Sequence, residues 1–379
     1  MSDVVLANAQ VVTPDETFVG AVHVADGRIA AVERGARVPP GAVDAAGDLV
    51  MPGLVELHTD VLERHAFPRP GVHWPEAAAV VAYDAHLASS GITTSFDSLS
   101  VGYVIDTRQR PRDPRGLAEA IAAGQAQGRL RAEHFLHIRC EVATEGVVAD
   151  YERLAADPLV RLVSLMDHTP GQRQFVNVDK YREYYSGKYG LSEPEIAALI
   201  DARRADHARY AGLHRAALAQ DCQARGLTLV SHDDATLAHV EEAAKIGTAV
   251  AEFPTTLEAA RAARAYGIAI LAGAPNLVCG RSHSGNIAAA DLADAGLLDI
   301  LSSDYVPASL LHGAVLLHRR HGLGLPAALR TVTATPAACA GLDDRGALTP
   351  GRRADLLRVR GDGDLPIIEG VWRQGRRIA

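Results

Sequence analysis

Short apolar runs alternate with longer alanine-rich stretches through the middle of the 379-residue chain. The apolar runs have the length of buried strands and occupy residues 53–60, 92–99, 135–141, 161–168, 227–232, 248–253, 268–273 and 300–304. Between them, segments such as 76–89, 116–127 and 193–220 have the length and composition of helices. Repeats of this kind predict an α/β fold, a closed (β/α)8 barrel with parallel strands. An open, doubly wound sheet is the alternative, but no glycine-rich phosphate loop follows the first run.

The two ends of the chain show a different pattern, in which β-branched runs are separated by turn residues. Such runs occupy residues 4–6, 10–12, 21–24, 29–32, 354–359 and 367–373. Each end alone has too few strands to form a stable sheet. We therefore predict one small β domain built from residues 1–52 and 342–379, with the barrel at residues 53–341.

Composition and charge narrow the classes of function. The chain is 48% hydrophobic and 22% charged, as is typical of a globular protein, and its net charge is −8. An acidic chain is a poor match for nucleic acid or for an anionic membrane, and no apolar run reaches the roughly 18 residues of a membrane span. Four widely spaced cysteines and a start without a basic and apolar leader predict reduced thiols and a cytoplasmic location.

Polar side chains collect where the predicted strands end. Histidines or carboxylates close five of the runs, at His58, Asp60, Glu141, His168, His232 and Asp304. In a parallel barrel these ends lie on one side, where carboxylates would repel one another without a cation. A single histidine at a strand end is usually structural, but this number of them favours a divalent metal. Histidine and carboxylate ligands suit zinc, with manganese, iron or magnesium as alternatives, and with one or two ions.

Cationic loops follow several of these strands. The candidate residues for binding substrate are Arg69, Arg173, Lys180, Arg182, Lys188, Arg281, Ser282, His283, Ser284 and Asn286. Arginine offers a fork of donors, and glycine and serine let the backbone approach a phosphate closely. A solvated surface turn is the alternative for the 281–286 loop. Cations above a metal site predict a polyanionic substrate.

Two segments carry a resemblance to a known family. MPGLVELHTD (51–60) resembles the first barrel strand of the amidohydrolase superfamily, and GRRADL (351–356) is similar to its C-terminal strand. The resemblance implies a metal-dependent barrel that carries a small β domain. Segments SLMDHTPGQRQF (164–175), AEFPTT (251–256) and LLDILSSDY (297–305) resemble the diphosphatase branch of phosphonate breakdown. That branch implies a phosphorylated sugar phosphonate as substrate, with diphosphate released from its 5-triphosphate.

The superfamily pattern carries over only in part. Its first motif is His-x-His, whereas here Asp60 takes the second position after His58. No lysine ends a strand, so the resemblance makes Glu141 the bridging ligand. His232 matches the fifth strand, and His168 replaces the histidine that the sixth strand lacks. Asp304 matches the aspartate of the eighth strand, which implies both a metal contact and a catalytic proton acceptor.

Two alternative functions stay open on the sequence alone. Hydrolysis of an amide or cyclic amide is common on this scaffold, and it would favour a neutral pocket with one carboxylate-binding arginine. A non-catalytic assembly protein would normally have lost several of the strand-end ligands. A homo-oligomer is possible, and nothing in the sequence tests it.

Overall fold

Eight parallel strands form the central sheet, and each pairs with the next along the chain. They are β6 (Leu54–Thr59), β7 (Ile92–Val101), β8 (Glu133–Glu141), β9 (Val160–Met166), β10 (Thr228–His232), β11 (Val250–Glu252), β12 (Ala269–Gly273) and β13 (Ile300–Ser302). A parallel bridge between Thr59 and Asp304 joins the first strand to the last, so the sheet closes into a barrel. The predicted (β/α)8 barrel and its eight strands are confirmed. The computed structural model describes residues 3–102, 113–282 and 286–379.

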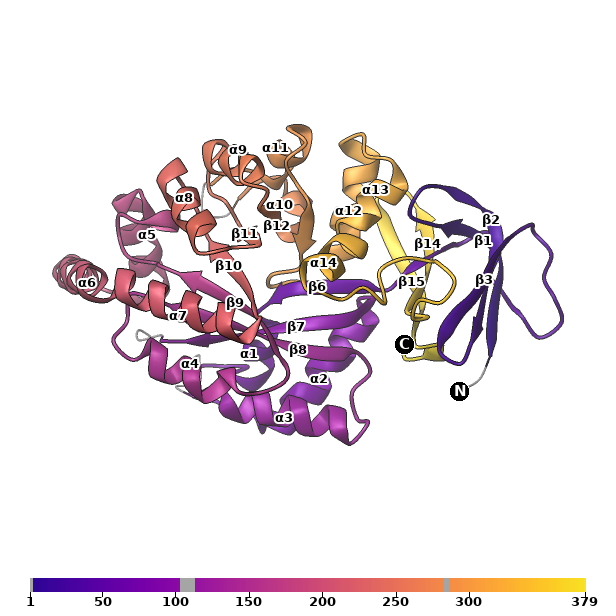
Figure 1. The fold of residues 1–379 in the computed structure, drawn as a ribbon, viewed down its shortest axis with the longest axis horizontal. Helices are drawn as coiled ribbons and strands as arrows, with labels where there is room; N and C mark the ends of the chain where they lie inside the picture. The colour runs from indigo at the N-terminus through magenta and orange to yellow at the C-terminus, as the bar shows by residue number, and fades with distance from the viewer. Residues whose placement is uncertain (1–2, 103–112, 283–285) are drawn as a thin grey trace.

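Helices surround the barrel and cover its apolar outer surface (Figure 1). They are α1 (Val61–Ala66), α2 (Glu76–Ser89), α3 (Arg115–Ala126), α4 (Val147–Ala155), α5 (Val178–Tyr189), α6 (Glu193–Asp206), α7 (Gly212–Arg225), α8 (Leu237–Lys245), α9 (Leu257–Ala265), α10 (Ala274–Cys279), α11 (Ala289–Asp294), α12 (Ser309–Arg320), α13 (Leu325–Arg330) and α14 (Ala334–Cys339). The predicted helix at 193–220 is interrupted by a π-helical turn, His207–Ala211, where His207 Nδ1 lies 2.8 Å from Asp167. No described helix is both long and apolar enough to cross a membrane.

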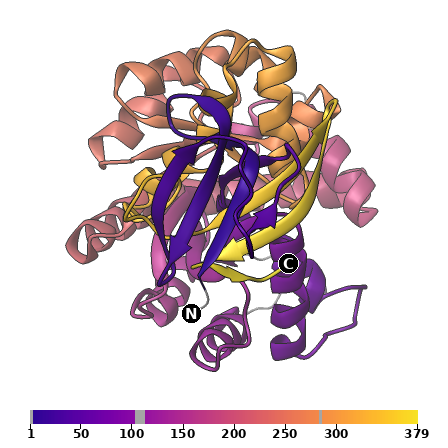
Figure 2. The ribbon, with the colours of Figure 1, turned by 90° about the vertical axis from the view of Figure 1, so that its right-hand side faces the viewer.

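A second sheet combines the two ends of the chain (Figure 2). Its strands are β1 (Val4–Val12), β2 (Thr17–Ala25), β3 (Arg28–Arg34), β4 (Val43–Asp44), β5 (Leu49–Pro52), β14 (Leu356–Asp362), β15 (Leu365–Arg373) and β16 (Arg376–Arg377). The C-terminal β14 pairs with β5, which pairs with β1, so neither end forms this sheet alone. Buried side chains from both ends, including Val11, Val50 and Trp372, share one apolar core. The sheet from both termini is therefore confirmed, while the domain boundaries at residues 52 and 342 stay a prediction.

Ion pairs join the C-terminal segment to the amino ends of barrel strands. Glu133, the first residue of β8, accepts hydrogen bonds from both Arg345 and Arg353. Arg345 also donates to Thr94 Oγ1, near the start of β7, over 2.9 Å. The small sheet is thus tied to the end of the barrel that lies opposite the carboxyl ends of the strands.

A buried polar network connects α2 to the β7 and β8 strands. His134 is fully buried between two carboxylates, with Nδ1 at 2.7 Å from Asp97 and Nε2 at 3.2 Å from Asp84. Tyr83 also donates to Asp97 over 2.7 Å. Burial opposes a charged imidazole, but Asp97 and Asp84 raise the pKa of His134 to about 9. The charged histidine is therefore part of the folded core at neutral pH.

Stability should consequently fall as alkali removes the His134 proton. The folded pKa is about 9 and the unfolded value is about 6.5, so the stabilisation is complete below pH 6.5 and is lost as the pH rises to 9. The loss amounts to roughly 3 kcal/mol. Urea unfolding of the wild type and of His134→Gln at both pH values measures it. An equally steep pH dependence in His134→Gln would contradict this role for the histidine.

Candidate active site

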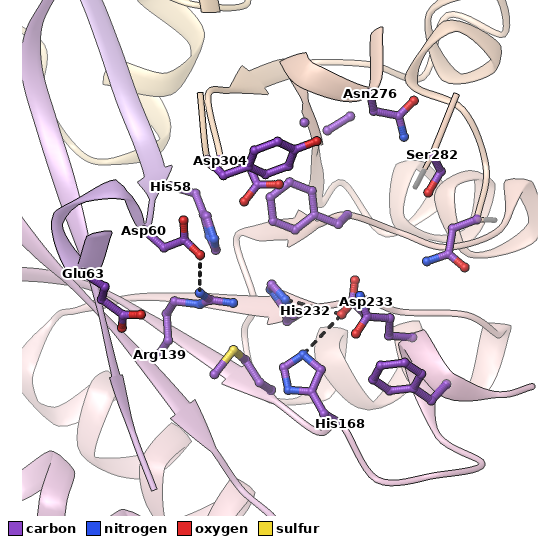
Figure 3. A pocket seen from close by; sticks show the side chains of 18 of the residues that line it. His58, Asp60, Glu63, Arg139, His168, His232, Asp233, Asn276, Ser282 and Asp304 are labelled. Atoms are coloured by element: carbon purple, nitrogen blue, oxygen red, sulfur yellow. Dashed lines mark ion pairs between the residues drawn. The ribbon is translucent and has the colours of Figure 1, made fainter. Parts of the chain in front are cut away.

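A cavity of about 560 Å³ opens at the carboxyl ends of the barrel strands. Among the predicted metal residues, those that line it are His58, Asp60, His168, His232 and Asp304. Among the predicted substrate contacts, Arg69, Ser282 and Asn286 line it as well. Figure 3 shows the side chains of His58, Asp60, His168, His232, Asp304 and Ser282 converging from different strands and loops. The structure therefore brings together most of the residues that strand-end chemistry had selected.

One buried carboxylate holds two of the histidines. Nδ1 of His58 lies 2.9 Å from Glu252 Oε1, and Nδ1 of His232 lies 3.1 Å from Glu252 Oε2. The Ser164 hydroxyl donates to the same Oε2 over 2.8 Å. An ionised carboxylate only accepts hydrogen bonds, so each imidazole donates from Nδ1 and, when neutral, keeps the Nε2 lone pair for a ligand. Such carboxylate–histidine pairs are typical of metal sites.

A second carboxylate holds the third histidine. Glu141 Oε1 accepts a bond from the His168 backbone N–H at 3.0 Å, and its Oε2 lies 2.6 Å from His168 Nδ1. Glu141 itself does not line the cavity. Both of its oxygens are engaged with His168, so its position differs from the bridging position that the family resemblance implied.

The donor atoms fit a divalent cation. His58, His232 and Glu252 form one group able to hold an ion, and His168, His232 and Asp233 form another, with the donor atoms of each group within 4.8 Å of one another. Within the described part of the chain, no donor makes a hydrogen bond to the buried Asp233 Oδ2. It lies 3.4 Å from His232 Nε2 and 3.7 Å from His168 Nε2. A carboxylate oxygen facing two imidazole nitrogens is a suitable arrangement for a shared metal.

The electrostatics of the cavity favour added positive charge. Burial raises the pKa of the Asp233 carboxyl to about 6 and lowers the pKa of His232 to about 3. Burial also opposes charge on His58 and His168, yet Glu252 raises the pKa of the first and Glu141 that of the second. A cation beside these carboxylates would reduce the cost of burying them.

Backbone strain marks the ends of three barrel strands. Asp233, Phe253 and Asp304 have positive φ angles of 56°, 54° and 51°, a region that side chains other than glycine rarely adopt. Main-chain hydrogen bonds hold all three, from Asp233 N to Glu252 O, from Phe253 N to Leu271 O and from Asp304 N to His58 O. Residues held in this conformation cluster at functional sites. Here all three lie just after barrel strands and line the cavity.

Several predicted substrate contacts lie elsewhere. Arg173 is 4% exposed, and its guanidinium is bound by Asp234 and Glu242 outside the cavity. Lys180 pairs with Glu183 and Arg182 with Glu193 along the α5 and α6 helices. Exposed Arg281 does not line the cavity. These positions do not support direct substrate contact, because neighbouring carboxylates or open solvent take up the charges. His283, Ser284 and the Lys188 side chain lie outside the described residues.

Five charged residues of the described site were not predicted from the sequence. Glu63, Arg64, Arg139 and Asp233 line the cavity, and Glu252 binds two of the cavity histidines. Arg139 precedes Glu141 by two positions, so strand alternation already placed it on the inner face. Asp233 follows His232 directly, so its position after the fifth strand was a signal that could have found it. Glu252 ends the sixth strand, where the superfamily pattern has a histidine, and this carboxylate was not selected from the sequence.

Comparison with known proteins agrees with this geometry. A profile of the amidohydrolase family matches residues 49–378. The chain belongs to the amidohydrolase family. It is 45% identical over 376 residues to the alpha-D-ribose 1-methylphosphonate 5-triphosphate diphosphatase of Escherichia coli (strain K12), covering 99% of this chain and 100% of that protein. The predicted resemblance is confirmed, and the family is generally metal-dependent.

Solved structures of amidohydrolases share the fold at low identity. The 5-methylcytosine deaminase from Klebsiella pneumoniae has a TM-score of 0.67 and 17% identity, covering 99% of this chain and 98% of its own. The N-isopropylammelide isopropylaminohydrolase from Burkholderia multivorans has a TM-score of 0.62 and 18% identity, covering 100% of this chain and 98% of its own. At this identity the likeness establishes the barrel and its small sheet, and no substrate.

Proposed function

We propose that this amidohydrolase is a metal-dependent diphosphatase of phosphonate breakdown. It hydrolyses alpha-D-ribose 1-methylphosphonate 5-triphosphate to the 5-phosphate and diphosphate, as the name of its full-length relative suggests. The observation that carries the proposal is the set of three cavity histidines, His58, His168 and His232, each held at Nδ1 by a buried carboxylate. A non-catalytic protein has no need to orient three imidazoles in this way.

The proposed metal ligands are the cavity-facing donors His58, Asp60, His168, His232, Asp233 and Asp304. Glu252 and Glu141 act as positioning residues, because their oxygens are occupied by imidazole and main-chain donors. The two donor groups share His232, which suits one ion or a close pair. Zinc matches this set of donors, with manganese, iron or magnesium as alternatives. When bound, the metal acts as a Lewis acid and lowers the pKa of coordinated water.

Other side chains of the cavity transfer the proton, bind the phosphates and bind the sugar. Asp304 accepts the proton of the attacking water, while one P–O bond forms and an anhydride P–O bond breaks. The lining arginines Arg64, Arg69 and Arg139 hold the anionic phosphates. Asn276, Ser282 and Asn286, from the segment that follows β12, offer neutral donors and acceptors that suit sugar hydroxyls. A cytoplasmic location and a possible homo-oligomer stay predictions.

Removing the metal should abolish diphosphate release. We expect the purified protein to release diphosphate from the ribose triphosphate, to lose this activity after treatment with a chelator, and to regain it with zinc or manganese. Diphosphate is quantified with a coupled pyrophosphatase assay, and metal by elemental analysis. Turnover of a cyclic amide such as dihydroorotate, with none of the triphosphate, would instead favour amide hydrolysis. Full activity in metal-free protein would contradict the proposal.

A further inference from the structure

Arg139 is a buried cation in the cavity, and the proposed metal site gives it no role. It lies on β8, lines the cavity and is only 8% exposed. Its closest carboxylate contact is Asp60 Oδ2, at 4.0 Å from Nη1, which is the outer limit of an ion pair. Within the described chain, its buried Nε–H has no hydrogen-bond acceptor. Figure 3 shows its guanidinium in the same cavity as His58, His168 and His232.

This arrangement is costly without an anionic ligand. Burying a guanidinium away from water costs several kcal/mol unless close acceptors satisfy it. The cost rises beside histidines and a metal, because like charges repel there. A strongly anionic group bound between Arg139 and the histidines would offset both penalties.

Two other arginines of the described residues line the cavity nearer to solvent. Arg64 and Arg69 are exposed, and Arg64 packs over the Tyr305 ring at 5.6 Å. Both belong to the segment that follows β6, at the mouth of the cavity. At this position, close to solvent, the two arginines could bind the terminal phosphates of a long substrate. Among the described arginines that line the cavity, Arg139 is the buried one, beside the histidines.

We propose that Arg139 is a catalytic residue that contacts the phosphoryl group under attack. The proposal rests on the diphosphatase function and adds the group that binds the reacting phosphorus oxygens. Water oxygen forms the new P–O bond, the anhydride P–O bond breaks, Asp304 takes the proton and diphosphate leaves as an anion. Arg139 donates to the equatorial oxygens, where negative charge accumulates in the transition state. Arg64 and Arg69 bind the departing diphosphate in the ground state as well.

Steady-state kinetics of Arg139→Gln and Arg69→Gln separate these two roles. We expect Arg139→Gln to lower kcat by roughly 10²- to 10³-fold, with metal content and melting temperature close to wild type. Arg69→Gln should mainly raise KM, since it contacts substrate and transition state alike. Inhibition by orthovanadate, which mimics the five-coordinate phosphorus of the transition state, should weaken more than inhibition by inorganic diphosphate in Arg139→Gln.

Two further variants keep the test decisive. Arg139→Lys preserves the charge and should regain part of kcat, although it lacks the planar fork. Arg139→Ala should regain activity when free guanidinium is added at millimolar concentration. If the wild type releases no diphosphate, the proposed function itself fails. If the wild type is active and Arg139→Gln keeps its kcat, or loses it only together with the metal, the catalytic role of Arg139 is overturned.

Discussion

Asp304→Asn is expected to lower kcat by about 10³-fold while the protein stays folded, with the proposed ligands His58, His168 and His232 still in place to hold the metal. Asparagine has nearly the same shape as aspartate, but it cannot accept the proton of the attacking water. It also tolerates the left-handed backbone at this position, where φ is 51°. The main-chain bonds that Asp304 makes with His58 and Asp60 are unaffected by the change.

A matched control is available in the small sheet. Asp26 is also an aspartate with positive φ, at 50°, but it is exposed and belongs to the turn between β2 and β3. Asp26→Asn should leave kcat unchanged, which isolates the chemistry from the backbone effect. The measurements are kcat for diphosphate release, metal content and melting temperature. Activity of Asp304→Asn near that of the wild type would assign the proton to another carboxylate, such as Asp60 or Asp233.

Glu252→Gln should weaken metal binding by roughly 10- to 100-fold and reduce activity in proportion. The carboxylate accepts bonds from His58, His232 and Ser164 on its two oxygens. A glutamine amide has one acceptor oxygen, so its NH2 group would face a donor and release one histidine. Although burial disfavours the carboxylate, His58 and His137 hold the pKa of Glu252 well below its usual value. Breaking a buried pair of this kind should also destabilise the fold by about 3 kcal/mol.

Glu242→Gln provides the comparison for Glu252→Gln. Glu242 also accepts from two partners, Arg173 and Arg215, but its side chain is 41% exposed and lies outside the cavity. We expect its replacement to leave metal affinity unchanged and stability only slightly lowered. Titration of metal into the stripped proteins, followed by calorimetry, measures the affinities. Equal metal affinity in Glu252→Gln and the wild type would remove the positioning role from Glu252.

The two networks of the molecule differ in what they support. The His134 cluster between α2 and the β7–β8 pair is closed, because Asp84, Asp97 and Tyr83 use its hydrogen-bonding groups internally. The network under the cavity is open on one side. Glu252 and Glu141 bind the Nδ1 atoms and leave the opposite nitrogens toward the ligand. The His134 cluster therefore contributes to the stability of the fold. The network under the cavity orients the histidines for the proposed metal.

Much of the fold was predictable from local patterns. Eight apolar runs of strand length, separated by helical segments, were enough to predict the barrel, and all eight became strands. One sheet built from both ends was predicted because neither end could complete a sheet alone, although β5 (Leu49–Pro52), which pairs with β14, was not among the predicted runs. Strand alternation and the position of strand ends were also enough to select His58, Asp60, His168, His232 and Asp304, because both are properties of adjacent residues.

The partners of charged side chains could not be predicted in the same way. Arg173, expected at the substrate, is instead neutralised by Asp234 and Glu242, which are distant in sequence. Arg139 was not selected from the sequence, yet it reaches the cavity, where Asp60 Oδ2 lies 4.0 Å from its Nη1. The roles of Glu141 and Glu252 depend on which histidines each carboxylate contacts in the folded chain. Periodicity determines the face on which a residue lies. Only the packed structure determines which opposite charge comes within a few ångströms, and Coulomb energy depends on that distance.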